Sequence, residues 1–232
     1  MYFCKKFCEN FAFNLLSVCG IARTHARIPN YKDTNCLRNN NTFDRFFATK
    51  NKVFMTAPDK RSMRRAIKGE IAKLSSSEKK SLSSQIFSAI AELQEIRQAS
   101  VVALFASLPD EPQTTAIIEQ LAQSKRIVLP RIEGDEMEFY DISEGLHEGA
   151  FGIMEPVATT PIEPSKIDVM IVPGVAFTRS GARLGRGKGF YDKYLSRKEF
   201  HAYTIGVCYP CQITDNIPVE PHDKIIDRIV SV

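Results

Sequence analysis

The stretch that decides the fold begins with Pro173-Gly174-Val175-Ala176-Phe177 and continues with Arg183-Leu184-Gly185-Arg186-Gly187-Lys188-Gly189-Phe190-Tyr191-Asp192. The apolar residues 167–172 precede it and the amphipathic residues 190–195 end it, which predicts the order strand, loop, helix. Alternate glycines at 185, 187 and 189 favour a tightly curled loop, because glycine accepts positive φ.

The charges of this stretch predict its ligand. Arg183, Arg186 and Lys188 place three cations within six residues, and the following helix offers its positive N-terminal end. Such a loop suits a polyphosphate, and the carboxylate of Asp192 is placed to hold a magnesium ion against it. The alternative is a tight basic turn on a solvated surface, which explains the combination of glycines, cations and an acid less well.

Two common phosphate-binding motifs are excluded. A P-loop requires a hydroxyl residue after its lysine, and Lys188 is followed by Gly189. The dinucleotide fingerprint requires a longer interval before its third glycine than this loop has.

The composition is that of an ordinary globular protein of 232 residues, 44% hydrophobic and 25% charged. No run of eighteen apolar residues is present, so no membrane association is expected. The net charge of +4 is uneven, because residues 1–54 carry nine Lys/Arg and three Asp/Glu, a net of +6, which leaves −2 for the remainder. Nucleic-acid binding by that remainder is therefore not expected.

Residues 1–54 differ from the rest and are predicted to be a leader without stable structure of its own. Three origins stay open: an unused upstream start with Met55 as the true initiator, an organelle transit peptide, and, least favoured, a secretory signal. A cytoplasmic location is expected, or an organelle if the segment is a transit peptide. Residues 55–232 fit one domain.

Cysteines and histidines give no catalytic or metal-binding pattern. Cys208 and Cys211 have the spacing of a redox motif but end an expected strand, and no second pair completes a zinc site. We interpret both as incidental residues of a reduced compartment. His147, His201 and His222 are dispersed and are expected at the surface or in loops.

Strands and helices alternate along residues 60–232, which predicts an α/β fold with a mostly parallel sheet and helices on both faces. Ser75 and Glu78 form a capping box that begins a helix expected to reach about Arg97. The expected helices cover about 60–74, 75–97, 114–124 and 190–195, and the expected strands cover about 100–106, 126–130, 136–142, 167–172, 202–209 and 224–232. The segment 151–156 is expected to be a turn or a short strand.

Ligands of such sheets bind beyond the carboxyl ends of the strands, so loops 108–112, 173–189 and 209–223 should meet over one cleft. The basic run Lys60-Arg61-Ser62-Met63-Arg64 opens the first helix, where its cations suit either a bound anion or a solvated face. Asp110 and Glu111 follow a buried strand, where they suit either a turn or a contact with a polar ligand group.

Taken together, these motifs resemble the 5-formyltetrahydrofolate cyclo-ligase family over about residues 60–230. The resemblance implies a layered, Rossmann-like α/β domain and an enzyme that uses ATP and Mg²⁺ to convert 5-formyltetrahydrofolate to 5,10-methenyltetrahydrofolate, with release of ADP and phosphate. A phosphorylated formyl intermediate is expected, with Arg186 and Lys188 as the catalytic residues. We expect a monomer whose partners are these small molecules, the folate with or without a polyglutamate tail.

The resemblance also implies site residues. ATP would be bound by Lys60, Arg61, Ser62, Met63, Arg64, Arg183, Leu184, Gly185, Arg186, Gly187, Lys188, Gly189, Phe190 and Tyr191. The folate would be bound by Arg64, Ala106, Glu111, Phe151, Arg186, Gly187, Lys188, Gly189 and Phe190. Magnesium would be held by Asp192 and Asp223.

Two positions depart from the family pattern. Phe190 stands where many members have tyrosine, which keeps the aromatic contact. Ala106 stands where a larger apolar residue can occur, which weakens that expected folate contact. The alternatives from other classes are a non-catalytic protein of the same fold that binds nucleotide or folate, and an RNA-binding module that depends on the basic leader; the second lacks interleaved aromatics on a sheet face.

Overall fold

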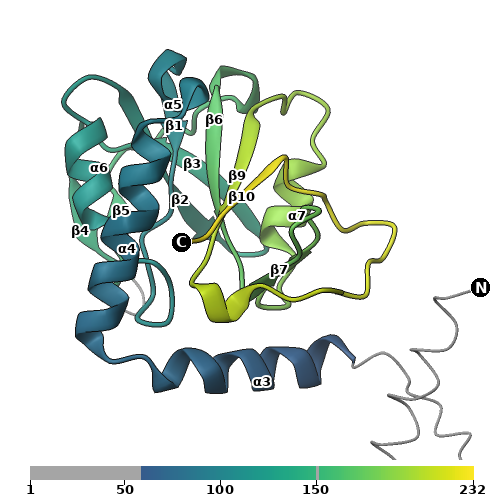
Figure 1. The fold of residues 1–232 in the computed structure, drawn as a ribbon. Helices are drawn as coiled ribbons and strands as arrows, with labels where there is room; N and C mark the ends of the chain where they lie inside the picture. Colours follow the sequence, from purple (N-terminus) through teal and green to yellow (C-terminus); the bar gives the residue numbers. More distant parts are fainter. Residues whose placement is uncertain (1–58, 150–151) are drawn as a thin grey trace, which may run out of the picture. The chain divides into compact units, whose positions relative to one another are not determined.

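The computed structural model of the chain describes residues 59–149 and 152–232 (Figure 1). The predicted leader, residues 1–54, and the predicted folate-contacting residue Phe151 lie outside the described residues. None of the helices in the described part combines the length and apolar character that a membrane crossing requires.

A six-stranded sheet with the order β10-β9-β6-β1-β2-β3 organises the described residues. All neighbouring strands in it run parallel except β3, which runs antiparallel to β2 at one edge. The strands are β1 (Val101–Ala103), β2 (Arg126–Glu133), β3 (Glu136–Asp141), β6 (Val169–Pro173), β9 (Tyr203–Val207) and β10 (Arg228–Val230). The predicted mostly parallel α/β sheet is confirmed.

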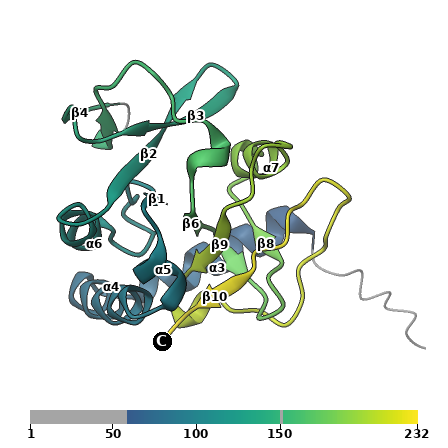
Figure 2. The same cartoon turned by 90° about the horizontal axis from the view of Figure 1, so that it is seen from above.

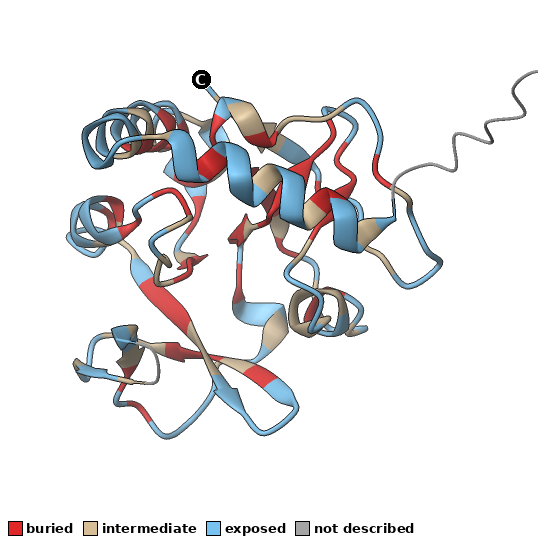
Figure 3. Ribbon diagram, turned by 90° about the horizontal axis from the view of Figure 1, so that it is seen from below, coloured by how far each residue is buried: buried red, intermediate tan, exposed pale blue. Residues whose placement is uncertain are grey.

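Helices cover both faces of this sheet, as the views from the side and from above show (Figures 1 and 2). One face packs against α4 (Ser76–Ala91), α5 (Gln94–Gln98) and α6 (Thr115–Leu121), and the other against α7 (Phe190–Leu195). The remaining helix, α3 (Lys60–Lys73), lies across the carboxyl ends of the parallel strands. Most of its residues are exposed (Figure 3).

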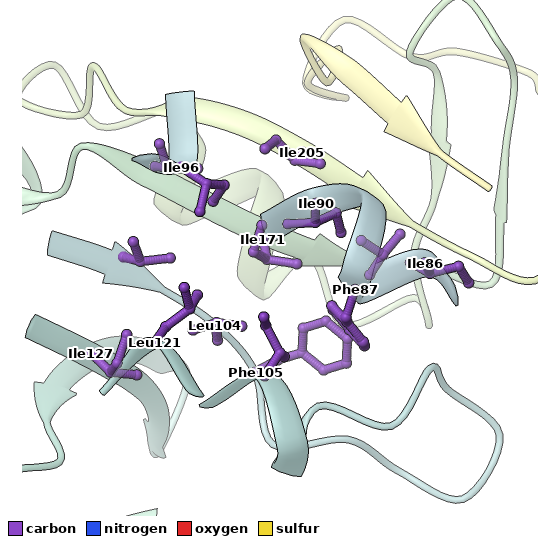
Figure 4. Close-up of a cluster of buried hydrophobic side chains, with 14 of the residues drawn as sticks. Ile86, Phe87, Ile90, Ile96, Leu104, Phe105, Leu121, Ile127, Ile171 and Ile205 are labelled. Atoms are coloured by element: carbon purple, nitrogen blue, oxygen red, sulfur yellow. The ribbon is translucent and has the colours of Figure 1, made fainter. Parts of the chain in front are cut away.

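Successive residues of the strands alternate between the two faces, which builds two apolar clusters. Val102 and Leu104 belong to the cluster under α4, whereas Ala103 belongs to the cluster under α7. Figure 4 shows the first cluster, in which Ile86 and Ile90 of α4 lie with side chains of the central strands. Burial of these branched aliphatic side chains stabilises the fold by about 1.5–3 kcal/mol for each side chain.

The helix expected to run from Ser75 to about Arg97 is in fact two helices. The capping box at Ser75 and Glu78 is present, but Leu93 is extended (φ −65°, ψ 139°) and separates α4 from α5. Ile96 lies six residues after Ile90 and would point away from its face in an unbroken helix, since each residue turns about 100°. The break lets Ile96 become fully buried.

Three pairs of antiparallel strands form hairpins whose pairing was not predicted from the sequence. Strands β2 and β3 are joined by the two-residue turn Gly134-Asp135, with Gly134 at φ 62°. Two small sheets pair β4 (Leu146–Glu148) with β5 (Met154–Pro156), and β7 (Ala176–Phe177) with β8 (Arg183–Leu184). Short 3-10 turns occupy Pro164–Lys166 and Pro210–Gln212.

Candidate functional site

A cavity of about 940 Å³ lies beyond the carboxyl ends of β1 and β6. All three loops that were expected to meet there contribute to it: Leu108 and Glu111 from the first, residues 173–174 and 183–189 from the second, and Asp223 from the third. The predicted cleft is therefore confirmed, and the N-terminal part of α3 forms a further wall.

The glycine-rich loop curls at one end of this cavity. Gly187 (φ 101°) and Gly189 (φ 74°) occupy the left-handed region, which other residues enter at a cost. Gly185 has another reason to be glycine: a β-carbon there would lie 3.0 Å from Nη1 of Arg183. Its carbonyl oxygen accepts a hydrogen bond of 2.7 Å from Nε of Arg64, so α3 and the loop are fastened together.

Arg183 is not the free cation that the sequence suggested. Its side chain is 4% exposed, and its Nη2 lies 2.9 Å from Oδ2 of Asp192 in the first turn of α7. Its Nε is buried without a hydrogen-bond partner in the structure. The pair ties β8 to α7, and both residues line the cavity.

Arg186 is also paired, whereas Lys188 is not. Nε and Nη2 of Arg186 lie 3.0 and 2.9 Å from Oε1 of Glu111, which belongs to the loop after β1. Lys188 is exposed, and the described residues hold no acidic partner for it. The unpaired positive charge of the loop is therefore that of Lys188, joined from α3 by Arg61 and Arg64, which likewise form no salt bridge with a described carboxylate.

Asp223 lies at the N-terminus of α3. Its Oδ2 is 2.6 Å from Nζ of Lys60 and accepts a hydrogen bond of 2.7 Å from the backbone N–H of Glu220. Partial burial alone would raise the pKa of Asp223, but the Lys60 ammonium and this N–H outweigh it and lower the pKa below its usual range. Asp223 is therefore a carboxylate at neutral pH.

The two predicted magnesium ligands occupy one region of the cavity wall. The backbone N–H of Lys224, next to Asp223, lies 3.4 Å from Oδ1 of Asp192. Two carboxylates in the lining of one cavity fit the way proteins hold Mg²⁺, which usually keeps several waters and takes few protein ligands. The described residues contain no cluster of three or more His, Cys, Asp or Glu side chains arranged for a metal, so phosphate oxygens and water would have to complete the coordination.

A second part of the cavity lining, here called the apolar end, is formed mainly by apolar side chains. Its lining includes Phe105 and Ala106 after β1, Ile132 of β2 and Met137 of β3. Burial raises the pKa of Tyr191, which keeps this neighbouring phenol neutral. This end suits a flat, largely uncharged ring system.

The β4–β5 hairpin adds Ile153 to this end and also the carboxylate side chain of Glu155, and Arg131 holds the end of β5 and the residues that follow it. Nη1 of Arg131 donates to the carbonyl oxygens of Pro156 at 3.1 Å and Ala158 at 2.9 Å. The position of the hairpin wall thus depends on an arginine of the central sheet.

Most of the predicted site residues meet at this cavity. Its lining contains Lys60, Arg61, Arg64, Ala106, Glu111, Arg183, Leu184, Gly185, Arg186, Gly187, Lys188, Gly189, Phe190, Tyr191, Asp192 and Asp223. Two predicted residues, Ser62 and Met63, do not line the cavity. Ser62 is exposed and hydrogen-bonds Asp59 at the N-cap of α3. Met63 packs into a small apolar cluster that also contains Val175 and Leu184. Ser62 lies on the side of the helix opposite Lys60 and Arg64, whereas Met63, three residues after Lys60, is buried.

Sequence reasoning missed the contribution of β2 and β3 to the apolar end. Pro130 and Ile132 share one face of β2, and Met137 pairs directly with Ile132 in the hairpin. The dipeptide Gly134-Asp135 between two strand-like runs was the available signal, because such a pair favours a hairpin. Glu220 and His222 also line the cavity and carry no motif that would have revealed them.

The cysteine pair shows no sign of redox chemistry. Burial raises the pKa of Cys208 to about 12 and also raises that of Cys211. Both are free thiols, and neither lines the cavity. These observations favour the interpretation of both cysteines as incidental.

The fold and the cavity define a class: α/β proteins with a ligand-sized cavity where parallel strands end. Comparison with known proteins narrows this class. The model of the "5-formyltetrahydrofolate cyclo-ligase family" matches residues 56–232. The chain belongs to the 5-formyltetrahydrofolate cyclo-ligase family.

Individual relatives agree with this family. A 5-formyltetrahydrofolate cyclo-ligase of Mus musculus is 28% identical over 187 residues, which cover 74% of this chain and 92% of the mouse protein. The 5,10-methenyltetrahydrofolate synthetase of Aquifex aeolicus superposes with a TM-score of 0.67 at 34% identity, over 74% of this chain and 89% of the other. The corresponding synthetase of Mycoplasma pneumoniae gives 0.62 at 28% identity, over 75% and 98%. The predicted family and the prediction of an enzyme are thereby confirmed.

Proposed function

We propose that the protein converts 5-formyltetrahydrofolate to 5,10-methenyltetrahydrofolate with consumption of ATP and release of ADP and phosphate. The observation that carries this proposal is that one cavity is lined both by a basic loop with an exposed Lys188 and by apolar side chains from β2, β3 and the segment after β1. A triphosphate matches the first end and a folate ring system the second. The names of the relatives support the same reaction.

The basic end would position the phosphates. Lys188, Arg64 and residues 185–189 line the cavity, and their charges and backbone N–H groups would surround the triphosphate. Phosphoryl transfer needs positioning and charge neutralisation more than covalent help from the protein. Asp192 and Asp223 would hold Mg²⁺, which supplies additional charge neutralisation on the phosphate oxygens when bound.

The proposed chemistry is a substitution at phosphorus followed by ring closure. The formyl oxygen attacks the γ-phosphorus of ATP and ADP leaves, which gives a phosphorylated iminium species. The aniline-type nitrogen of the folate then attacks the formyl carbon and gives up its proton, and the carbon–oxygen bond breaks to release phosphate. Lys188 and Arg186 would stabilise charge that develops on the transferred group.

The apolar end would hold the folate. Ile132, Met137 and Ala106 offer contact surface for a flat ring, and the buried carboxylate of Glu111, 7% exposed, offers a hydrogen-bond acceptor beside it. A monomeric state and a cytoplasmic or organellar location stay predictions.

The experiment is a direct assay of the whole chain. Protein, Mg²⁺, ATP and 5-formyltetrahydrofolate are mixed, and absorbance in the methenylfolate band is followed together with ADP and phosphate. We expect one ADP and one phosphate for each methenyl product, and no product when ATP or Mg²⁺ is omitted. Binding of both ligands without product would instead support a non-catalytic binding protein.

A further inference from the structure

Arg186 lines the cavity and contacts two carboxylates of the loop after β1. Its Nε and Nη2 lie 3.0 and 2.9 Å from Oε1 of Glu111, and Nη2 also lies 2.5 Å from Oδ1 of Asp110. Glu111 and Arg186 line the cavity, whereas Asp110 does not. Asp110 thus reaches the site only through the guanidinium.

The two carboxylates differ in how firmly they are fixed. Oε2 of Glu111 accepts a hydrogen bond of 3.0 Å from the backbone N–H of Leu108, and its own carbonyl accepts one of 2.9 Å from the Tyr209 hydroxyl. Glu111 is therefore held in place by its own loop and by the segment after β9. Asp110 is 33% exposed and has Arg186 as its salt-bridge partner.

Asp110 is charged in the neutral range. Partial burial would raise its pKa, but the hydrogen bond and charge of Arg186, with a smaller contribution from Lys68, lower the pKa below the usual value. Arg186 therefore contacts two carboxylates, that of Glu111, which lines the cavity, and that of Asp110, which does not. A charge-assisted contact of this kind fixes the orientation of a planar guanidinium.

We propose that Asp110 is a positioning residue that holds Arg186 over the cavity while Glu111 engages the substrate. This inference rests on the proposed function, in which Glu111 accepts a hydrogen bond from the folate and Arg186 faces the transferred phosphoryl group. A ligand that takes up Oε1 of Glu111 competes with Arg186 for it. The contact with Asp110 then keeps the guanidinium in place, so the two substrates can be bound together.

The physical consequence concerns the rate more than the binding of the folate. Without Asp110, Arg186 is free to swing with Glu111 or into solvent once the folate arrives. Misplacement of a catalytic group by about 1 Å can cost up to about 100-fold in rate. The folate itself never touches Asp110, so its apparent affinity should change little.

The test compares Asp110→Ala with Asp110→Glu, Arg186→Ala and the double variant Asp110→Ala/Arg186→Ala, in steady-state assays that vary ATP and folate separately. The matched control is Asp141→Ala, because Asp141 likewise pairs with an arginine, Arg126, and has a lowered pKa but lies outside the cavity. Thermal unfolding of every variant is recorded. Asp110→Asn, which keeps the size of the side chain, replaces Asp110→Ala if the latter is unfolded.

We expect Asp110→Ala to lower kcat about 10- to 100-fold with less than about twofold change in KM for the folate. Asp110→Glu should restore part of kcat, Asp141→Ala should retain it, and Asp110→Ala should add nothing further in the Arg186→Ala background. Equal kcat for Asp110→Ala and Asp141→Ala would overturn the positioning role, as would a full additional loss in that background. An inactive wild-type chain would overturn the proposed function and this inference with it.

Discussion

The two ends of the cavity are built in different ways. The basic end comes from one short loop and one helix terminus, and its acidic and basic side chains hold one another, as Arg183 holds Asp192 at 2.9 Å and Lys60 holds Asp223 at 2.6 Å. The apolar end comes from separate strands, with Ile132 and Met137 paired across a hairpin. Charge balance orders the first end, and strand register orders the second.

The difference separates positions that should contribute to ligand binding from positions that should contribute to the free energy of unfolding. At the basic end Lys60, Arg183 and Arg186, half of the lysines and arginines that line the cavity, are already paired with carboxylates, so a bound triphosphate would find its free charge mainly at Lys188, Arg61 and Arg64. At the apolar end Ile132 is 53% exposed, whereas Phe105 and Met137 are buried. Substitutions at the basic end should therefore change turnover or stability, whereas substitutions at the apolar end should change the KM for the folate.

The largest expected effect is that of Lys188→Ala. Removal of one preorganised charge at the transferred group costs about 10²- to 10³-fold in kcat. Because Lys188 is exposed and has no salt bridge with a described residue, the free energy of unfolding should stay the same. Steady-state kinetics and chemical denaturation measure both, with Lys198→Ala, an exposed lysine outside the cavity, as the control. A folded Lys188→Ala protein with normal turnover would contradict the assignment.

Asp192→Asn, at the same end of the cavity, should differ from Lys188→Ala in that it strongly lowers the free energy of unfolding. The substitution leaves the guanidinium of Arg183 buried without its counter-charge, and loss of one partner of a buried pair costs about 3 kcal/mol. Chemical denaturation in the absence of nucleotide isolates this effect from any role in metal binding. Glu199→Gln removes an exposed carboxylate just beyond the same helix and serves as the control. Equal stability of the two variants would show that the pair contributes nothing.

Ile132→Ala probes the apolar end and should act on the folate alone. Loss of an apolar contact surface of this size weakens binding by about 1 kcal/mol, so KM for 5-formyltetrahydrofolate should rise about fivefold while KM for ATP stays constant. Ile225→Ala is the matched control, because Ile225 is similarly exposed, at 56% against 53%, and lies outside the cavity. A rise in KM for ATP instead would exchange the proposed roles of the two ends.

The smallest expected effect is the pH dependence of the Lys60–Asp223 pair. Because the folded-state pKa of Asp223 is lowered, its contribution to stability is full above the usual pKa of about 3.8 and is lost as the pH falls through the folded-state pKa. The wild type should exceed Asp223→Asn in unfolding free energy by about 1 kcal/mol at pH 7, and the difference should shrink below about pH 3.8. Denaturation curves at pH 7 and pH 3 provide the comparison. A difference that grows toward low pH would contradict the sign of the shift.

The basic end could be predicted from the sequence and the apolar end could not. Glycines, cations and acids stand within residues 183–192, so their proximity follows from the sequence itself. Ile132 and Met137 become neighbours only through the register of β2 and β3. Local patterns predict strands but not their pairing, and the turn at Gly134-Asp135 was the single local clue.

The charge state of the loop also escaped prediction. Arg183 and Arg186 count as free cations in the sequence, yet each is claimed by a carboxylate, Asp192 for the first and Glu111 and Asp110 for the second. Glu111 lies 75 positions from Arg186, and only the parallel order of β1 and β6 brings their loops together. The topology of the fold, and not the motif, therefore determines which cation has no carboxylate partner and can pair with a ligand.

The most direct test of this account is a crystal structure of the full chain with Mg²⁺ and a non-hydrolysable ATP analogue. We expect the triphosphate between Arg64, Lys188 and the backbone of residues 185–189, with the metal at Asp192 and Asp223. The region around Ile132 and Met137 should stay free for the folate. Phosphates bound elsewhere, with the glycine-rich loop open to solvent, would contradict it.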